Sequence, residues 1–333
     1  MNVTVGTFNL NNLFGRWNFY ADVPESDEIT DAPPTWLAPE ASPANAPDVR
    51  IVIEGNQTPT GIRWRTNPYT GKVVFKKEPA AVKKLADRIK AIDVDVLAVQ
   101  EVESIEALEE FVREQKLVDY RHRVLVEGND DRLIDVAVLS KYPLGPVTSW
   151  RHRTYKRRNE RPVFSRDLLQ VDVLSQSRRR VLFTLFNNHL KSKLARDDEE
   201  RKEGNKRRKR QVATIVDILE EYPPLGPYIV VGDMNDGPDS NCLRALRNHG
   251  VINALRDPDE TGGPYPAKDP TPPATKAWTH RYRGDGRTDY ELFDHIWLSP
   301  DLAARQNGAW IHRRKTRGGD ATDHDPPYIS LKL

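Results

Sequence analysis

The chain has 333 residues, of which 38% are hydrophobic and 30% charged, and its formal net charge at pH 7 is +2. This balance is typical of a globular chain with a large solvated surface, and it excludes the overall charge of a histone-like protein. The one cysteine, Cys242, excludes an intrachain disulfide and favours a reducing compartment.

No stretch approaches the ~18 apolar residues that would span a bilayer, so we expect no membrane association. The N-terminal MNVTVGTFNLNNLF lacks the basic and apolar regions of a signal peptide. We therefore expect a cytoplasmic protein, or a secreted one if a leader has been removed.

The first element, VTVGTFNL, alternates apolar and polar residues and predicts a β-strand that ends at Asn9. Residues 16–49 contain several prolines and are predicted to be irregular. Three short strand-like runs follow, RIVIEGN, GIRWRTN and KVVFKKE, and the turn sequences between them indicate a small meander. We interpret residues 16–78 as an insertion in a single catalytic domain that spans residues 1–333.

A helix is predicted to begin at Pro79, because apolar residues then recur at helical spacing. The buried strand DVLAVQEV follows and ends in Gln100-Glu101. Ser104 is predicted to cap a second helix that runs to about Leu117. Beyond it, one strongly charged helix near residues 198–221 interrupts a series of strands, which are HRVLVEG, IDVAVLS, SRDLLQVDVLS, RRVLFTLFNNHL, YIVVGDMN, LFDHIWLS and YISLKL. This order predicts an α+β fold or a two-sheet sandwich rather than a doubly wound parallel sheet.

Polar residues gather where the apolar strands end. These residues are Asn9, Gln100-Glu101, Asn188-His189, Asp233, Asn235, Asp294 and Asp323-His324. Burial of unpaired carboxylates costs several kcal/mol each, whereas strand ends on a shared rim avoid that cost and can converge on one cleft. Because the available ligands are oxygens and imidazoles, they favour Mg²⁺ or Mn²⁺, with Ca²⁺ as an alternative, over a thiolate zinc site.

Several of these motifs, in this order, resemble the endonuclease/exonuclease/phosphatase (deoxyribonuclease I-like) superfamily: TFNLNNLF, VQEVE, IDVAVLSKYP, FNNHLKSK, VVGDMND, FDHIWLS and TDHDP. Together with FSRDLL, they are most similar to its bacterial nuclease-type members. The resemblance implies a four-layer α/β/β/α sandwich with two packed mixed β-sheets. It also implies divalent-metal-dependent hydrolysis of a phosphate ester at one edge of the paired sheets.

The resemblance also implies roles for individual residues. Glu101 corresponds to the metal-binding glutamate, with Asn9 and Asp323 as further metal or water ligands. Asn11 stands where some relatives carry a second acid, which argues against a two-metal arrangement. The predicted catalytic residues are Asp233, which orients or deprotonates water, Asn235, which holds a phosphate oxygen, and the two pairs His189–Asp135 and His324–Asp294. An acid bonded to one ring nitrogen raises the basicity of a histidine and fixes its tautomer.

Arg166, Asn188 and Lys191 are predicted to bind substrate, although Arg166 alone is equally consistent with a structural strand residue. Asp236 and Asp325 are interpreted as turn residues, and the other six histidines stay unassigned. Basic clusters occur at 151–161, 178–180, 206–210 and 313–317, and in the insertion at Arg63-Trp64-Arg65. Clustered arginines with aromatic neighbours suit a nucleic-acid backbone, while DDEER before the third cluster also suits an ordinary salt-bridged helix.

We therefore expect a nuclease with little sequence specificity that hydrolyses DNA, with RNA as an alternative substrate and no obligate protein partner. A phosphomonoesterase or phospholipase on the same scaffold is the second hypothesis, in the manner of an inositol-phosphate phosphatase or a sphingomyelinase. A lipid enzyme should show an exposed apolar hairpin, and the strands of the insertion are too charged for one. A non-catalytic binding module is the third, and the complete set of acids, amides and histidines argues against it.

Overall fold

The computed structural model describes residues 1–14, 18–22, 29–30, 64–65, 70–74, 77–130, 132–155, 161–224, 226–262, 273–284, 287–315 and 321–333. The chain divides into two compact units. The larger unit comprises Met1–Leu13 and Lys77–Leu333, and the smaller unit comprises Phe14–Lys76. The boundaries lie close to those of the insertion predicted at residues 16–78.

Two large β-sheets form the centre of the larger unit. The seven-stranded sheet has the order β14-β18-β19-β1-β6-β8-β7. Its strands are β14 (Asp259–Gly262), β18 (Gln306–Arg313), β19 (Pro327–Lys332), β1 (Asn2–Leu13), β6 (Val96–Val102), β8 (Asp135–Ser140) and β7 (His122–Leu125). The six-stranded sheet has the order β13-β17-β12-β11-β10-β9. Its strands are β13 (Ile252–Asn253), β17 (Asp294–Leu298), β12 (Tyr228–Asp233), β11 (Val181–His189), β10 (Leu168–Leu174) and β9 (Leu144–Ser149).

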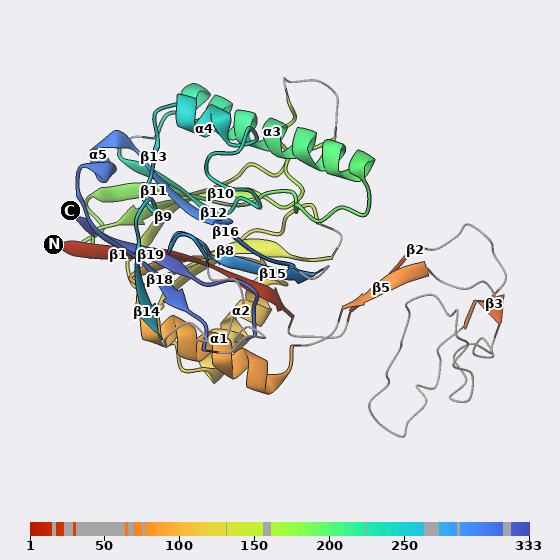
Figure 1. The fold of residues 1–333 in the computed structure, drawn as a ribbon. Coiled ribbons are helices and arrows are strands. Elements are labelled where there is room, and N and C mark those ends of the chain that lie inside the picture. Colours follow the sequence, from red (N-terminus) through yellow and green to blue (C-terminus); the bar gives the residue numbers. More distant parts are fainter. Residues whose placement is uncertain are drawn as a thin grey trace. The chain divides into compact units, whose positions relative to one another are not determined.

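Both sheets are mixed, because β1 with β6 and β11 with β12 are parallel pairs among antiparallel ones. A further hairpin joins β15 (His280–Gly284) and β16 (Arg287–Glu291) outside both sheets. The ribbon shows the two sheets stacked in the middle of the larger unit, with helices on the outer face of each (Figure 1). This arrangement confirms the predicted four-layer α/β/β/α sandwich.

Three hydrophobic clusters hold the four layers together. The central one lies between the sheets and joins β1 and β6 residues such as Val5 and Val96 to β11 and β12 residues such as Leu185 and Val231. Its members alternate along each strand, as the two-residue period of a strand requires. The second cluster packs α1 (Pro79–Ile92) and α2 (Ile105–Glu114) on the seven-stranded sheet. The third packs α3 (Asp198–Glu221) and α4 (Arg244–Asn248) on the other sheet.

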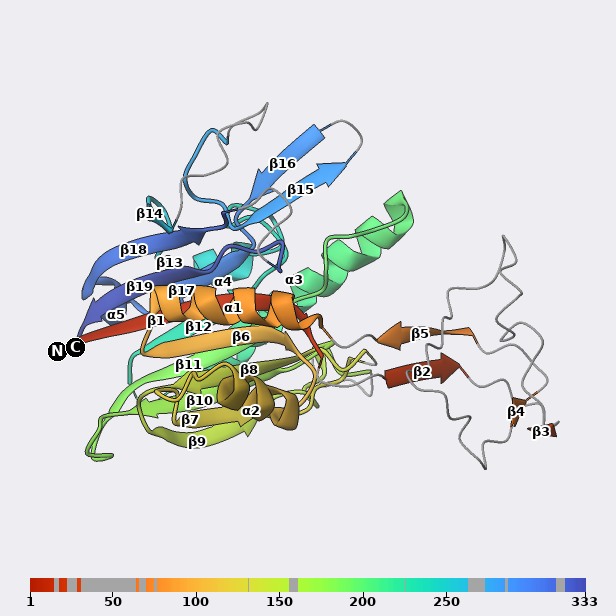
Figure 2. The ribbon, with the colours of Figure 1, turned by 90° about the horizontal axis from the view of Figure 1, so that it is seen from below.

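The helix termini follow the sequence signals closely. Pro79 occupies the first position of α1. The Ser104 hydroxyl accepts a hydrogen bond from the backbone N–H of Ala107 and so caps α2, which ends at Glu114, three residues before the predicted end. At α3 the Asp197 carboxylate accepts from the N–H of Glu200. The turned view shows α1 and α2 on one face of the seven-stranded sheet (Figure 2). None of the described helices combines the length and apolar character that crossing a bilayer requires.

Several elements were not predicted, and the smaller unit corrects part of the sequence analysis. Strands β9, β13, β14, β18 and the β15–β16 hairpin are polar or short, which hides their period. In the smaller unit, β2 (Asn18–Asp22) pairs with β5 (Thr70–Val74), and β3 (Ile29–Thr30) pairs with β4 (Trp64–Arg65). Residues 16–49 are therefore not wholly irregular, and the described strands do not form a meander of sequential neighbours. The predicted strand RIVIEGN lies outside the described residues.

The short helix α5 (Pro300–Ala303) follows β17 directly and returns the chain toward β18. Both chain ends lie together, since the Met1 ammonium donates to the Leu333 carbonyl and Asn2 pairs with Lys332 between β1 and β19. The last strand thus pairs with the first, and the residues that precede it are carried to the opposite end of β1 from Met1. That end of the sandwich is where the polar strand ends converge.

Candidate active site

Strand register brings three of the predicted side chains together in the six-stranded sheet. His189 at the end of β11 is the register partner of Asp233 at the end of β12, and Asp233 is the partner of Asp294 at the start of β17. Gly232 allows this approach: its φ is +130°, and a Cβ there would lie 2.0 Å from the Asn188 carbonyl oxygen. In the other sheet Asn9 is the partner of Gln100, directly before Glu101.

A bulge directs Glu101 into the site. The register of β6 shifts at this residue in its pairing with β1 and also in its pairing with β8. Glu101 itself has a φ of +62°. Bulges of this kind re-aim a side chain, and strained backbone of this kind clusters at functional sites. Glu101 Oε2 accepts a hydrogen bond from the Asn12 backbone N–H at 3.0 Å, and Oε1 lies 3.3 Å from the donating Asn9 Nδ2. The carboxylate therefore faces the cleft, where it is supported by neutral donors.

Asp233 lies at the centre of the polar cluster. Its Oδ1 accepts from the Asn235 backbone N–H at 2.8 Å, and its Oδ2 accepts from Asn9 Nδ2 at 3.0 Å. The same Oδ2 lies 3.4 Å from His189 Nε2 and 3.9 Å from His324 Nε2. Burial raises the pKa of Asp233, against the opposing effect of nearby His324. This carboxylate is therefore held as a proton acceptor of unusually high basicity.

The predicted pairing of His324 with Asp294 is formed. Nδ1 of His324 lies 2.7 Å from Asp294 Oδ2, and both side chains are buried. Burial by itself lowers the pKa of His324, but the carboxylates of Asp294 and Asp233 raise it to about 10. A protonated ring donates from Nδ1 to Asp294 and leaves Nε2–H directed toward the Asp233 side of the cleft. The histidine is thus a buried cation next to the place where a phosphate would bind.

Asp325 has a structural role that the sequence analysis did not predict. Its carboxylate is fully buried and accepts from Arg88 Nη2 at 2.8 Å and from Arg314 Nε at 3.0 Å, while Arg313 Nη1 lies at 3.4 Å. These guanidinium groups hold the pKa of the Asp325 carboxyl below its usual range, although burial raises it. Arg88 Nη1 also donates to the His324 carbonyl oxygen at 3.0 Å. We name this group, Asp325 with Arg88, Arg313 and Arg314, the arginine cluster.

The predicted pair of His189 with Asp135 forms no hydrogen bond in this structure. Asp135 Oδ1 accepts from the Gly128 N–H at 2.8 Å, while Asp135 Oδ2 and His189 Nδ1 have no hydrogen-bond partner among the described residues. Asp135 is buried away from the cleft, and burial raises its pKa to about 7. Burial and the Arg166 guanidinium lower the pKa of His189 well below its usual value. His189 faces Asp233 and Glu101 instead.

The structure separates the three residues predicted to bind substrate. Arg166 lines the cleft, with its Nε 3.1 Å from Asp130 Oδ2. Asn188 does not reach the cleft, because alternation along β11 directs it to the opposite face from His189, where its Nδ2 donates to the Val231 carbonyl at 2.8 Å. Lys191 lines a neighbouring pocket instead of the cleft. The prediction that Asn188 binds substrate is therefore wrong.

Two cleft residues, and a lysine that interacts with Glu101 and Asp323, were missed by the sequence analysis. His280 Nε2 lies 3.3 Å from Asp323 Oδ2, and its ring stacks on Phe293 with centroids 4.7 Å apart. Lys77 donates to the Asn11 carbonyl, and burial lowers its pKa while Glu101 and Asp323 raise it. Arg132 bonds Asp130 at 3.0 Å at the cleft wall. The sequence carries no signal for these residues, since each lies in a loop or a hairpin far from the recognisable motifs.

The donor set of the cleft suits a hard divalent cation. Glu101 presents a partly exposed carboxylate next to the Asn9 amide, and Asn11 Nδ2 connects this side of the cleft to Asp323 Oδ1 at 3.2 Å. Among the described residues, two groups of acids and histidines are also compact enough to hold an ion: His280 with Asp323 and His324, and Asp233 with Asp294 and His324. Carboxylate and amide oxygens are the ligands that Mg²⁺ and Mn²⁺ prefer.

All these groups open into one cleft of about 690 Å³. The predicted residues that line it are Asn9, Glu101, Arg166, His189, Asp233, Asn235, Asp323 and His324. Asp294 lies directly behind His324, so of the predicted catalytic and metal-binding residues only Asp135 lies apart. Basic side chains at the walls include Arg132, Lys193 and Arg201, and the acids Asp289 and Glu291 line the cleft beside them.

Comparison with known proteins agrees with this geometry. No curated protein matches the sequence. Among solved structures, an endonuclease/exonuclease/phosphatase from Bacteroides vulgatus has a TM-score of 0.54 at 15% identity, covering 76% of this chain and 90% of that chain. A humanized D. rerio TDP2 gives a TM-score of 0.53 at 13% identity, covering 100% of this chain and 99% of that chain. The 3′ phosphatase NExo from Neisseria, bound to a product DNA hairpin, gives a TM-score of 0.52 at 15% identity, covering 77% of this chain and 95% of that chain.

These structural likenesses show the fold, and a sequence model gives the family. Residues 73–324 match the model of the Endonuclease/Exonuclease/phosphatase family, which is most of the chain. The matched segment begins within β5, and it contains Glu101, His189, Asp233, Asp294 and His324. The chain therefore belongs to the endonuclease/exonuclease/phosphatase family, whose members are metal-dependent phosphoric ester hydrolases.

Proposed function

We propose that this protein is a divalent-metal-dependent phosphodiesterase that cleaves nucleic acid, with DNA as its main substrate and little sequence specificity. The observation that carries the proposal is the convergence of Asp233, His189, His324 and Glu101 in one cleft with basic walls. In this arrangement a proton acceptor, a buried imidazolium and metal-binding oxygens all meet within reach of one phosphate.

Glu101 and Asn9, with Asp323, are the residues that would hold the cation, Mg²⁺ or Mn²⁺. When bound, such an ion polarises a phosphate oxygen and offsets the negative charge that develops during hydrolysis. Lys77 already brings a positive charge to the same side of the cleft, since it interacts with both Glu101 and Asp323. The acids therefore face a cationic environment before any ion binds.

The residues of the chain itself account for the remaining steps. Water adds to the phosphorus atom, and its proton passes to Asp233, whose raised pKa suits it to this acceptor role. The bond from phosphorus to the leaving oxygen then breaks, and that oxygen takes a proton from solvent. The His324 imidazolium and the Asn235 amide stabilise the added negative charge on the phosphate. Asp294 keeps His324 charged and oriented, and acts through it as a positioning residue.

The exposed surface around the cleft supports a nucleic-acid substrate. Tyr282 on β15 lines the cleft and is 48% exposed, so its ring is available for a base to stack on. Arg132, Arg166 and Arg201 line the same cleft and can contact phosphates on either side of the scissile one. A cleft with one aromatic wall and basic walls suits a polyanion with flat bases better than a single small phosphate.

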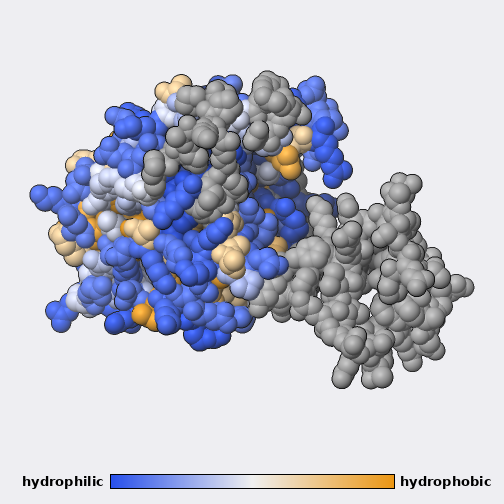
Figure 3. Space-filling view, turned by 60° about the horizontal axis from the view of Figure 1, so that its bottom comes forward, coloured by the Kyte–Doolittle hydropathy of each residue, from blue (hydrophilic) through white to orange (hydrophobic). Residues whose placement is uncertain are grey.

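The described surface gives no support to a lipid substrate. Of its exposed large hydrophobic residues, Leu194 and Tyr282 line the cleft, and the others lie elsewhere: Met1, Val118, Val147 and Tyr222. The visible face of the larger unit is largely hydrophilic, with small separate apolar areas (Figure 3). The β15–β16 hairpin beside the cleft has the sequence HRYRG and RTDYE, which is too polar to insert into a lipid surface.

A substrate panel tests the proposal. Purified protein with Mg²⁺ or Mn²⁺ is incubated with supercoiled plasmid, linear duplex, single-stranded DNA, RNA, an inositol phosphate and sphingomyelin. The proposal predicts cleavage of DNA that EDTA abolishes. Release of inorganic phosphate from the inositol phosphate, or of phosphocholine from sphingomyelin, with all nucleic acids intact would contradict it.

A further inference from the structure

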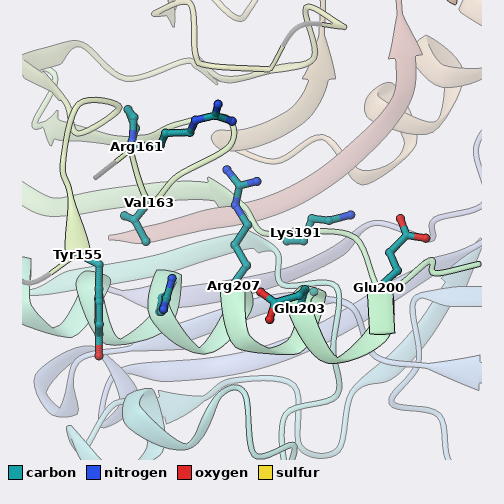
Figure 4. Close-up of a pocket in the computed structure, with 10 residues that line it drawn as sticks. Tyr155, Arg161, Val163, Lys191, Glu200, Glu203 and Arg207 are labelled. Carbon is teal, nitrogen blue, oxygen red and sulfur yellow. The ribbon is translucent and has the colours of Figure 1, made fainter. Parts of the chain in front are cut away.

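A second pocket lies beside the catalytic cleft, and no catalytic residue lines it. It has a volume of about 430 Å³ and is bounded by one face of α3 and by the segments around Arg161 and Lys191. The close-up shows Arg207 extending from α3 toward the same space as Arg161, with Lys191 and Glu200 nearer the start of the helix (Figure 4). We name it the basic pocket.

The charges of the basic pocket are not balanced. Four cationic side chains line it, Arg161, Lys191, Arg207 and Arg210, against the two acids Glu200 and Glu203. Both acids are engaged elsewhere: Glu200 Oε2 accepts from the Arg196 backbone N–H at 2.9 Å, and Glu203 bonds Lys206 at 3.1 Å. The pocket therefore carries a surplus of positive charge.

The cations of the basic pocket are largely free to bind a ligand. Arg210 lies over the Tyr155 ring, 5.6 Å from its centroid. Arg161, Lys191 and Arg207 form no side-chain hydrogen bond or ion pair with any described residue. Burial and the nearby Arg166 guanidinium lower the pKa of Lys191 against the opposing effect of Glu200, and burial lowers the pKa of Arg207 against the opposing effect of Asp130. Because the cations of the pocket outnumber the two acids that line it, an anionic ligand would offset the remaining positive charge.

The basic pocket and the catalytic cleft are lined by residues of the same two segments. Lys191 follows His189 by two residues, and Arg208 Nη1 donates to the carbonyls of both Lys191 and Ser192 at 3.0 Å, which fixes the segment between the two sites. Helix α3 contributes to both, because Arg201 lines the cleft whereas Arg207 lines the pocket. Neighbouring residues of one loop and of one helix therefore line the two sites.

We propose that the basic pocket binds a phosphate of the nucleic-acid strand other than the one that is cleaved. This inference rests on the proposed function and extends it, since it assigns a second phosphate site to the same substrate. A substrate with a single phosphate cannot occupy the cleft and the pocket together. The pocket therefore favours a polynucleotide over a small phosphoester, and it reads the backbone rather than the bases.

Binding without turnover tests the pocket directly. The probes are a fluorescein-labelled single-stranded DNA and an RNA of the same sequence, titrated in EDTA at several salt concentrations. Arg161→Gln/Lys191→Gln/Arg207→Gln should bind at least tenfold more weakly than the wild type, with a salt slope smaller by about 0.7, because the pocket neutralises one phosphate and each neutralised phosphate of a single strand contributes ~0.7 to the slope. The single variant Arg207→Gln should show about a third of that change.

The control removes the same charge elsewhere. Arg178, Arg179 and Arg180 are exposed at the turn before β11, and the nine residues of that strand separate them from His189 by roughly 27–30 Å. Substitution of all three by Gln should alter the affinity far less than the pocket variant does. Equal losses in the two triple variants, or wild-type affinity and salt slope in the pocket variant, would overturn the inference.

Kinetics separate the pocket from the proposed function. Bis(p-nitrophenyl) phosphate has one phosphate and cannot bridge the two sites. In the pocket variant, the fold-loss of its turnover should therefore be at least ten times smaller than the fold-loss of oligonucleotide turnover. A wild-type protein that binds the oligonucleotide through the pocket but never cleaves it would contradict the proposed function and leave the pocket in place. If the wild type cleaves the oligonucleotide and the pocket variant loses turnover equally on both substrates, only the inference about the pocket is contradicted.

Discussion

Replacement of Asp325 by asparagine should destabilise the protein strongly, although the residue lies outside the catalytic cleft. Asp325 is the shared anion of the arginine cluster, and all four of its side chains are between 0% and 5% exposed. Asparagine keeps the size of the side chain but removes its charge. Arg88 and Arg314 would then be buried without the charge of Asp325, whereas Arg313 would keep its ion pair with Glu260 at 2.6 Å.

The expected magnitude follows from this burial. Removal of one partner of a buried ion pair typically costs about 3–5 kcal/mol, because an uncompensated buried charge remains. Arg88 and Arg314 also donate to backbone carbonyls, Arg88 to those of His324 and His312 and Arg314 to those of Thr279 and Asp323. These neutral acceptors satisfy hydrogen bonds but not charge. We therefore expect the free energy of unfolding of Asp325→Asn to fall by about 3–5 kcal/mol.

Urea denaturation followed by tryptophan fluorescence measures this loss. The matched control is Asp87→Asn, which removes the acid of an exposed i, i+4 pair with Lys83 on α1 and should cost less than about 1 kcal/mol. Because Arg88 also bonds the His324 carbonyl, Asp325→Asn should lose phosphodiesterase activity even at temperatures where it stays folded. A loss of stability no greater than that of Asp87→Asn would refute the account of the cluster.

Three further predictions concern the Tyr282 ring, the buried His295 and the metal. Tyr282→Ala should lower kcat/KM on single-stranded DNA about tenfold, since stacking on an aromatic contributes ~1–3 kcal/mol per base; Tyr282→Phe should stay close to the wild type, and an equal loss in both would contradict stacking. Burial holds the pKa of His295 at about 4 in the folded protein, against about 6.5 when unfolded, so the free energy of unfolding should fall by about 3 kcal/mol as pH drops from 6.5 to 4. Urea denaturation at several pH values measures this fall, and an equally steep fall in His295→Gln would contradict the assignment. EDTA should abolish activity, and added Mn²⁺ should restore it. Glu101→Gln should need a higher Mn²⁺ concentration than the wild type for half-maximal rate. An unchanged Mn²⁺ concentration for half-maximal rate would show that Glu101 is not a metal ligand.

The sequence predicted the location of the site because strand ends obey simple geometry. His189, Asp233 and Asp294 each lie at a strand end, and pairing of those strands makes them register partners. The family resemblance that the motifs carry implied the two packed sheets and the His324–Asp294 pair. A two-residue period fixes which side of β11 a residue faces, so the misplacement of Asn188 could have been avoided by extending the alternation from Phe186, which packs against α3.

Other parts of the site depend on tertiary contacts that a pattern does not encode. Lys77 and His280 come from segments without periodicity, and their partners Asn11 and Asp323 are distant in sequence. The role of Asp325 was also unpredictable, because its three guanidinium partners come from α1 and from the end of β18. A buried acid and a turn acid look identical in sequence until the residues that surround them are known.

The most direct test of the central claim is the rate of plasmid cleavage by Asp233→Asn in Mn²⁺, compared with the wild type. The substitution keeps the size of the side chain but removes the proton acceptor at the centre of the cluster, and loss of general base catalysis reduces rates by about 10²–10⁴. The account predicts that the wild type converts supercoiled plasmid to nicked or linear DNA and that Asp233→Asn, while as folded as the wild type by circular dichroism, is at least 100-fold slower. An Asp233→Asn protein within tenfold of the wild-type rate, or a wild type that leaves the plasmid intact, would contradict it.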